Sequence, residues 1–138
     1  MPIESNFDKN LAIEFLRQTI QELQAVFLNG GVIREEFKRD SDVDIAVKTE
    51  VDISNRSRWS IQEALASKLN RNVDLLVLGK PSLVIEFEVV STGEMVVCSD
   101  QAQVDLYETT VYSRYWDFNS TRKAIIEAIV NRGAVYGG

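Results

Sequence analysis

The chain has 138 residues, 45% of them hydrophobic, with 21 acidic and 15 basic residues for a net charge of −6. This length and composition predict one globular domain rather than two. The acidic balance argues against non-specific nucleic-acid binding, because phosphate neutralisation needs a basic surface, and it favours a basic protein partner. The sequence has no histidine, which excludes Ser-His-Asp triads and His-ligated zinc sites.

Membrane and export features are missing from the sequence. No apolar run approaches the roughly 18 residues of a membrane span, and the N-terminal residues lack a signal-peptide pattern. The single cysteine, Cys98, has no histidine to activate it, so we expect a structural role for it. These features predict a cytoplasmic protein without membrane association.

The first part of the chain predicts a helix followed by two strands. Apolar residues recur at helical spacing over residues 11–23, and residues 25–28 predict a short strand that leads into Gly30 and Gly31. Residues 42–47 predict a second strand, because apolar and other residues alternate there.

The middle of the chain continues the alternation. Residues 61–69 carry a helical stripe, and the apolar run 72–78 predicts a third strand. Pro81 suits the first turn of a helix that ends at Gly93, and residues 94–99 predict a final strand. The order of elements predicts an α+β fold in which a mixed sheet packs against helices.

The C-terminal segment 101–138 is helical and aromatic in pattern. Its large aromatic residues are Tyr107, Tyr112, Tyr115, Trp116 and Phe118, and its apolar stripe continues with Ile125, Ile126 and Ile129. Such residues anchor protein partners, and they equally pack a helix onto its own domain. The sequence leaves both interpretations open, and we expect residues 131–138 to fray.

Two carboxylates fall on one side of the second predicted strand. In an extended chain Val43, Ile45 and Val47 point to one face, whereas Asp42 and Asp44 point to the other. Residues two apart on a strand lie about 6 to 7 Å apart at Cα, so their oxygens can converge on Mg²⁺, which prefers oxygen ligands. The pattern predicts a site for a metal-bound triphosphate.

A third carboxylate, Asp74, lies in the apolar run 72–78. A charge inside a buried strand is costly unless it is paired or bound to a metal. The alternative for the segment from Ser41 to Asp44 is an ordinary turn, in which serine and aspartate are common. Three strand carboxylates behind the Gly30-Gly31 turn favour the metal site over the turn.

These motifs resemble the nucleotidyltransferase fold, whose pattern is Gly-Ser, ten residues, Asp-x-Asp, and a third Asp on a later strand. Gly30, the block Ser41-Asp42-Val43-Asp44-Ile45, the helix with Arg58-Trp59, and Val73-Asp74-Leu75 carry the likeness over about residues 8–97. Together they look like the minimal nucleotidyltransferase (MNT) antitoxins of HEPN/MNT toxin–antitoxin modules. The resemblance implies a nucleotidyltransferase domain over residues 1–100 and a helical extension over 101–138 packed on the same domain.

The resemblance also implies a function. In that family the antitoxin uses ATP to attach AMP to a tyrosine of its partner, a HEPN ribonuclease. Carried over, Asp42, Asp44 and Asp74 are the catalytic and metal-binding residues for Mg²⁺, and Asp74 is a metal ligand or a general base. Gly30, Gly31, Arg34 and Ser41 are the expected nucleotide-binding residues. Homo- or hetero-oligomers both remain open.

Two positions depart from the family pattern. Gly31 stands where the family has Ser, so a hydroxyl that hydrogen-bonds the triphosphate is missing, although backbone amides remain. Arg34 is followed by Glu35, where family members often have Gly, which places an acid near the expected phosphate site. For the Arg34 side chain the sequence leaves three surroundings open: a phosphate of the nucleotide, a neighbouring acidic residue, or solvent. The alternative function is therefore a catalytically weakened or silent antitoxin that acts by binding, and a small-molecule nucleotidyltransferase is a third.

Overall fold

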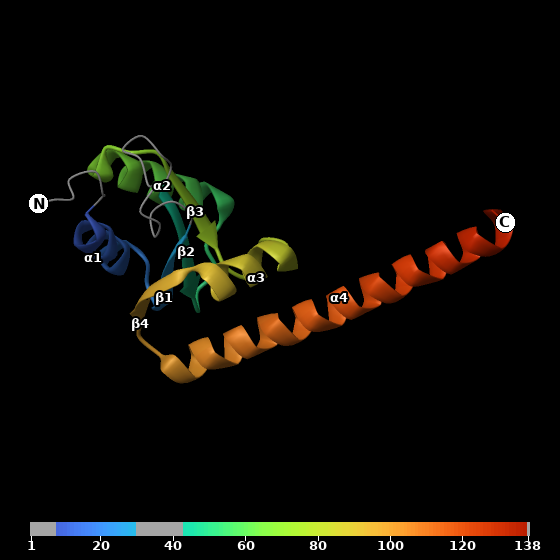
Figure 1. Cartoon of the computed structure of the whole chain (residues 1–138). Helices are drawn as coiled ribbons and strands as arrows, with labels where there is room; N and C mark the ends of the chain where they lie inside the picture. Colours follow the sequence, from blue (N-terminus) through green and yellow to red (C-terminus); the bar gives the residue numbers. More distant parts are fainter. Residues whose placement is uncertain (1–7, 30–42, 138) are drawn as a thin grey trace, which may run out of the picture.

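The chain's structure is a computed structural model that describes residues 8–29 and 43–137. The order of helices and strands is the predicted one (Figure 1). The elements are α1 (Lys9–Thr19), β1 (Leu23–Asn29), β2 (Val43–Thr49), α2 (Asn55–Leu69), β3 (Val73–Val77), α3 (Leu83–Thr92), β4 (Glu94–Cys98) and α4 (Gln101–Gly137).

The strands form one four-stranded sheet in the order β3-β2-β1-β4. β1 lies antiparallel to both β2 and β4, whereas β2 and β3 are parallel. The sheet is therefore mixed, which confirms the predicted α+β class. The parallel pair is joined through α2, the crossover helix that such a connection needs.

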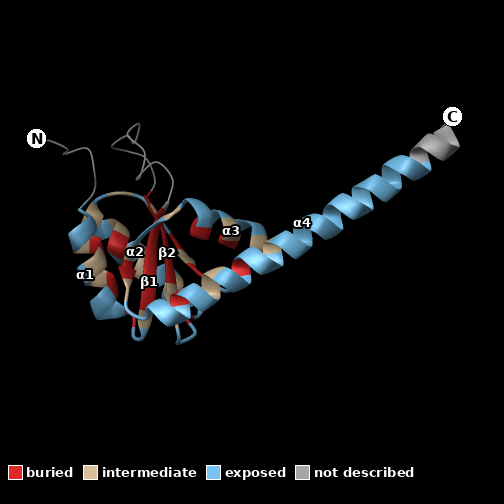
Figure 2. Cartoon of the chain, turned by 60° about the horizontal axis from the view of Figure 1, so that its bottom comes forward, coloured by how far each residue is buried: buried red, intermediate tan, exposed pale blue. Residues whose placement is uncertain are grey.

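Helices cover both faces of the sheet (Figure 2). On one face α1 and α2 contribute Leu16 and Leu65 to a core with Ile45. On the other face α3 and α4 contribute Val89 and Val104 to a second core. The alternation predicted for β2 is confirmed: Val43, Ile45 and Val47 all lie in the first core, and Ala46 lies in the second.

The ends of the helices follow local sequence rules. The Asp8 carboxylate accepts a hydrogen bond from the Leu11 amide at 3.1 Å and begins α1. Ser54 and Ser82 cap α2 and α3 in the same manner, with Ser57 and Ile85 as donors. The Gly93 amide donates to the Val89 carbonyl at 2.8 Å, and α3 stops there as predicted.

Two sequence predictions about element ends are wrong. Leu23 does not continue the first helix, because Ile20 turns the backbone to an extended conformation (φ −105°, ψ 119°) and Glu22 adopts φ 58°. Leu23 therefore begins β1. The expected fraying from residue 131 is also not observed, since α4 runs on to Gly137.

α4 has two parts with different surroundings (Figures 1 and 2). Its first turns pack on the domain, where Val104 and Val111 are buried. Residues 117–132 are exposed throughout, and this part projects beyond the sheet and the other helices. In the part of the chain that the structure describes, no helix combines the length and apolar character needed to cross a membrane.

Candidate active site

Asp44 and Asp74 are brought together by the parallel pairing of β2 with β3. The two residues are register partners in this ladder. Paired residues on neighbouring strands lie about 5 Å apart at Cα, so the two carboxylates sit side by side. Asp44 is half-buried and Asp74 is exposed, which leaves the pair open to solvent on the β3 side.

Both carboxylates emerge on the face of the sheet that α3 and α4 cover. Asp44 precedes Ala46 by two residues, and Asp74 precedes Leu76 by two. Ala46 and Leu76 pack in the core on the α3/α4 side. Because side chains alternate along a strand, Asp44 and Asp74 lie on that same face. The carboxylates therefore mark the starts of β2 and β3, at the end of this second core.

The end of β1 lies at the same edge of the sheet. Asn29, its last residue, is the register partner of Asp44. The predicted phosphate turn follows directly in the sequence. Gly30, Gly31, Arg34, Ser41 and Asp42 all lie outside the described residues, so their roles remain sequence predictions.

The sequence prediction that Asp74 is a buried charge is wrong. Asp74 is exposed rather than buried, because β3 is an outer strand of the sheet. The flanking residues Val73 and Leu75 point to the opposite face and are buried there. Its carboxylate therefore carries no burial cost, and its placement opposite Asp44 is the evidence for a site.

A shallow hollow of about 320 Å³ adjoins Asp74 along the outer edge of β3. The Lys80 ammonium at its rim donates to the Ile53 carbonyl and lies 3.2 Å from the Asp52 carboxylate. The hollow is lined by Asn55, Arg58, Asp74, Leu75, Leu76, Val77, Lys80 and Pro81.

Comparison with known proteins identifies the family. A family model described as "Polymerase beta, Nucleotidyltransferase" matches residues 10–102. Protein adenylyltransferase MntA of Shewanella oneidensis is 32% identical over 123 residues, which cover 89% of this chain and 88% of MntA. The chain belongs to the minimal nucleotidyltransferase (MNT) antitoxins, within the polymerase beta nucleotidyltransferases.

Solved structures agree with this MNT assignment. A chain in a crystal structure of a toxin–antitoxin with AMP-PNP is 31% identical, with a TM-score of 0.78, covering 93% of this chain and 99% of that one. A chain in the tri-AMPylated Shewanella oneidensis HEPN toxin in complex with MNT antitoxin is also 31% identical. Its TM-score is 0.72, and the match covers 88% of this chain and 94% of that one.

Two residues of α2 hold β3 of the MNT domain in place. The Gln62 side-chain oxygen accepts a hydrogen bond from the Leu75 amide at 2.9 Å. Arg58 donates to the Leu75 carbonyl at 3.2 Å and to the Gln62 oxygen at 3.0 Å. Together they provide hydrogen-bond partners for the Leu75 amide and carbonyl at the outer edge of β3, next to Asp74. Gln62 was not predicted from the sequence. It could have been found from its position four residues after Arg58, which puts both side chains on one side of a helix.

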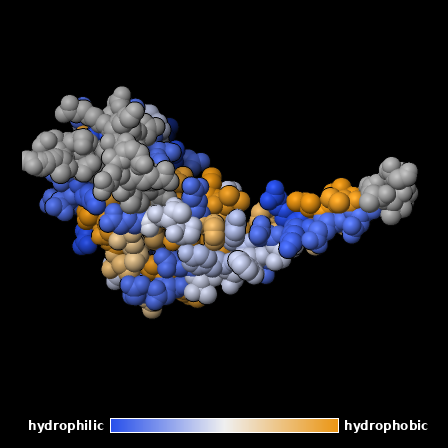
Figure 3. All heavy atoms as spheres, viewed as in Figure 1, coloured by the Kyte–Doolittle hydropathy of each residue, from blue (hydrophilic) through white to orange (hydrophobic). Residues whose placement is uncertain are grey.

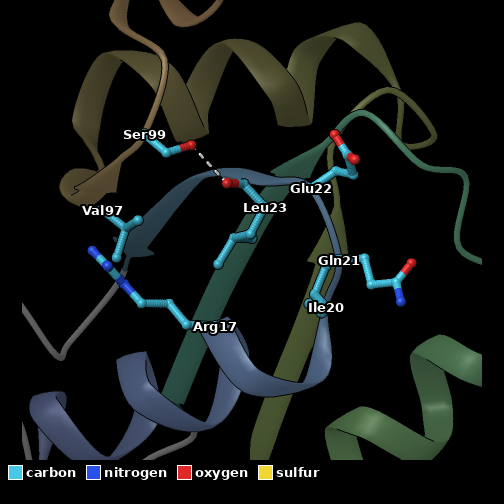
Figure 4. A pocket seen from close by; sticks show the side chains of 7 residues that line it. All are labelled: Arg17, Ile20, Gln21, Glu22, Leu23, Val97 and Ser99. Carbon is cyan, nitrogen blue, oxygen red and sulfur yellow. Dashed lines mark hydrogen bonds between the residues drawn. The ribbon is translucent and has the colours of Figure 1, made fainter.

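A larger hollow of about 530 Å³ lies at the other end of the MNT sheet (Figure 4). It lies beside Leu23, the first residue of β1, whereas the carboxylates face the last. The Ser99 hydroxyl donates to the Leu23 carbonyl at 2.7 Å, which joins the start of β1 to the chain that follows β4. Neither Asp44 nor Asp74, the two predicted site residues that the structure describes, lines it.

Proposed function

We propose that this chain transfers AMP from ATP to a tyrosine of a cognate HEPN ribonuclease and so neutralises it. The observation that carries the proposal is the side-by-side placement of Asp44 and Asp74 at the sheet edge where β1 ends. The relative named protein adenylyltransferase MntA, and the matched complexes with AMP-PNP and with an AMPylated HEPN toxin, support the same reaction.

The donor set fits Mg²⁺. Asp44 and Asp74 present two carboxylates from adjacent strands, and hard oxygen ligands are what this ion binds. Within residues 8–29 and 43–137 no cluster of three or more potential ligands occurs. The third carboxylate of the proposed set is Asp42, which precedes β2. When bound, the ion neutralises charge on the triphosphate during displacement.

Asp74 is the residue of the pair that an incoming hydroxyl reaches. It is exposed and borders the hollow at the edge of β3. In the proposed reaction the acceptor oxygen forms a bond to the α-phosphorus of ATP, and the bond to the leaving pyrophosphate oxygen breaks. Asp74 orients the acceptor hydroxyl and takes up its proton, or binds the metal, while Asp44 contributes ligand oxygens from the half-buried position.

The second candidate is an MNT-fold antitoxin that neutralises its partner by binding alone. Two sequence observations favour it: Gly31 in place of the family Ser, and Glu35 beside Arg34. The lost hydrogen bond to a charged phosphate is worth about 1.5 to 3 kcal/mol. A change of that size weakens ATP binding, and the paired carboxylates of β2 and β3 remain in place.

The experiment that tests the proposal combines the purified chain, the HEPN-type protein encoded beside its gene, Mg²⁺ and labelled ATP. We expect mass additions of AMP on the partner, and loss of this label with Asp44→Asn and with Asp74→Asn. Circular dichroism on both variants controls for folding. An unmodified but stably bound and inhibited partner would support the binding-only candidate, and absence of both labelling and binding would overturn the toxin–antitoxin function.

A further inference from the structure

One face of α4 runs unbroken from the domain into solvent. Residues on this face recur every three or four positions, the spacing that keeps side chains on one side of a long helix. We call it the seam. It consists of Val104, Glu108, Val111, Tyr115, Phe118, Arg122, Ile125, Ile129 and Arg132.

The first half of the seam packs on the chain's own domain. Val104 and Val111 are buried, and the Tyr115 ring stacks on Phe87 of α3 with centroids 3.7 Å apart and an interplanar angle of 9°. Glu108 is half-buried, and burial, followed by the charge of Asp105, raises the pKa of its carboxyl. The seam is thus the packing face of α4.

The second half of the seam also carries large apolar side chains, but no other described element packs against them. Phe118 is 46% exposed, Ile125 54% and Ile129 59%. Ile126 and Val130 beside them are also exposed. Hydrophobic side chains gather accordingly on the projecting arm (Figure 3). This distal seam continues a packing face beyond the surface on which it packs.

A helix of this kind needs a partner for physical reasons. The sixteen positions 117–132 extend about 24 Å at 1.5 Å per residue. An isolated helix of about that length is marginal in water unless an apolar face is packed. Covering three or four large apolar side chains supplies that packing energy.

The charges identify the kind of partner. Arg122 and Arg132 lie on the seam, so a second copy aligned in parallel would place Arg122 against Arg122. Three basic and two acidic residues lie in 117–132, which gives the arm a net charge of +1 and leaves −7 for the rest of the chain. The charged residues of the distal seam are Arg122 and Arg132, whereas Asp117 and Glu127 lie off it. The distal seam therefore complements an apolar groove bordered by carboxylates, whereas the acidic domain complements a basic surface.

We propose that the distal seam, from Phe118 to Arg132, docks into an apolar groove with flanking carboxylates on the HEPN-type partner. Ile125 and Ile129 are the buried anchors, and Arg122 pairs with a carboxylate at the rim. The inference rests on the proposed function for the identity of the partner. It adds that the arm holds the complex together, separately from the carboxylates that act on the acceptor.

The test compares two double variants with the same added charge on the same helix. Ile125→Lys/Ile129→Lys disrupts the seam, whereas Ser120→Lys/Ala124→Lys changes the opposite side with the same spacing. Binding of each full-length chain to the HEPN-type partner is measured by calorimetry without ATP. We expect the seam variant to lose affinity by about 100-fold or more, as for two central hot spots, and the control to stay within about threefold.

Further measurements keep the result interpretable. Helicity and melting temperature show that both variants fold, and Ile125→Ala/Ile129→Ala, which preserves helix propensity, is expected to lose about tenfold or more in affinity. Equal affinity of seam and control variants, or no binding by the wild-type chain, would overturn the inference. A wild-type dimer that the seam variant converts to a monomer would identify a second copy as the occupant and also overturn it.

The measurement without ATP separates this inference from the proposed reaction. If the wild-type chain binds through the seam but transfers no AMP, the reaction fails and the docking surface stands. If the seam variant still binds and labels the partner as the wild type does, the docking surface fails and the reaction stands.

Discussion

Asp44 and Asp74 occupy the same register of the β2–β3 ladder, although they belong to strands separated in sequence by α2. The parallel pairing puts both carboxylates on one face, and the hydrogen bonds from α2 to Leu75 hold the outer strand in that register. A slip of one residue would turn Asp74 to the opposite face of the sheet. The strand pairing is therefore the structural basis of the proposed site.

Neutralising Asp74 is expected to affect ligand binding more than folding. Without a bound metal the two adjacent carboxylates repel each other, so Asp74→Asn should leave the melting temperature unchanged or slightly higher. Mg²⁺ with ATP at about 100 times its dissociation constant should stabilise the wild type by about 2.7 kcal/mol, and the variant by far less. Thermal unfolding with and without Mg²⁺-ATP measures both effects. Equal stabilisation of both proteins would show that Asp74 does not help to bind the nucleotide complex.

Gln62 is expected to matter for the stability of β3. Gln62→Leu leaves the Leu75 amide without its acceptor and removes one partner of Arg58, at a cost of about 1 to 3 kcal/mol in unfolding free energy. Gln62→Glu keeps an oxygen acceptor and should cost much less. Urea unfolding of the two variants tests this, and equal losses would mean that the hydrogen bond at Leu75 is not what stabilises the edge.

The Tyr107 hydroxyl donates a hydrogen bond to the buried Glu86 carboxylate between α4 and α3. Tyr107→Phe should cost about 1.5 to 3 kcal/mol, because it removes a hydrogen bond to a charged group. Tyr112→Phe, at an exposed tyrosine of the same helix, should stay within about 0.5 kcal/mol. Chemical unfolding of both variants measures these losses in unfolding free energy, and equal losses would show that the hydrogen bond to Glu86 does not stabilise the fold.

The contribution of Tyr107 to stability is expected to depend on pH in the alkaline range. Burial, then the hydrogen bond to Glu86 and its negative charge, raise the pKa of the Tyr107 phenol far above its usual range. The unfolded chain ionises this phenol first, so its contribution to stability is complete below about pH 10 and falls as the pH rises above that value. Absorbance titration at alkaline pH should be the same for folded wild type and Tyr107→Phe, and should differ by one tyrosine in denaturant. A full tyrosine of difference in the folded proteins would contradict the burial of this group.

Gly31→Ser is expected to increase nucleotide affinity. The substitution restores the hydroxyl of the family pattern, and a hydrogen bond to phosphate worth about 1.5 to 3 kcal/mol corresponds to roughly a ten- to 150-fold lower dissociation constant for ATP. Gly31→Ala adds a side chain without the hydroxyl and is the control. Calorimetric titration with ATP and Mg²⁺ compares the two, and equal affinities would show that the hydroxyl has no role here.

Much of the fold followed from local pattern. The alternation in β2, the glycine that ends α3, and a short strand over residues 94–99, observed as Glu94–Cys98, were predicted, because they depend on neighbours in the sequence. The start of α3 was predicted wrongly: Pro81 was expected in its first turn, whereas Ser82 caps the helix and Leu83 begins it. The boundary at Leu23 was not predicted. Its apolar character suits either a helix or a strand, and the turn at Glu22 and the pairing with Thr49 decide between them.

By itself the sequence determined that Asp44 and Asp74 are acids at strand positions in a recognisable family pattern, from which a role in nucleotidyl transfer is predicted. Only the tertiary structure decided that they face each other, because register depends on hydrogen bonds between strands distant in sequence. It also showed that the C-terminal helix packs on the domain through its first turns, whereas residues 117–132 are exposed. The apolar stripe is continuous in the sequence, but the domain covers only its first half, because the helix extends beyond the surface on which it packs.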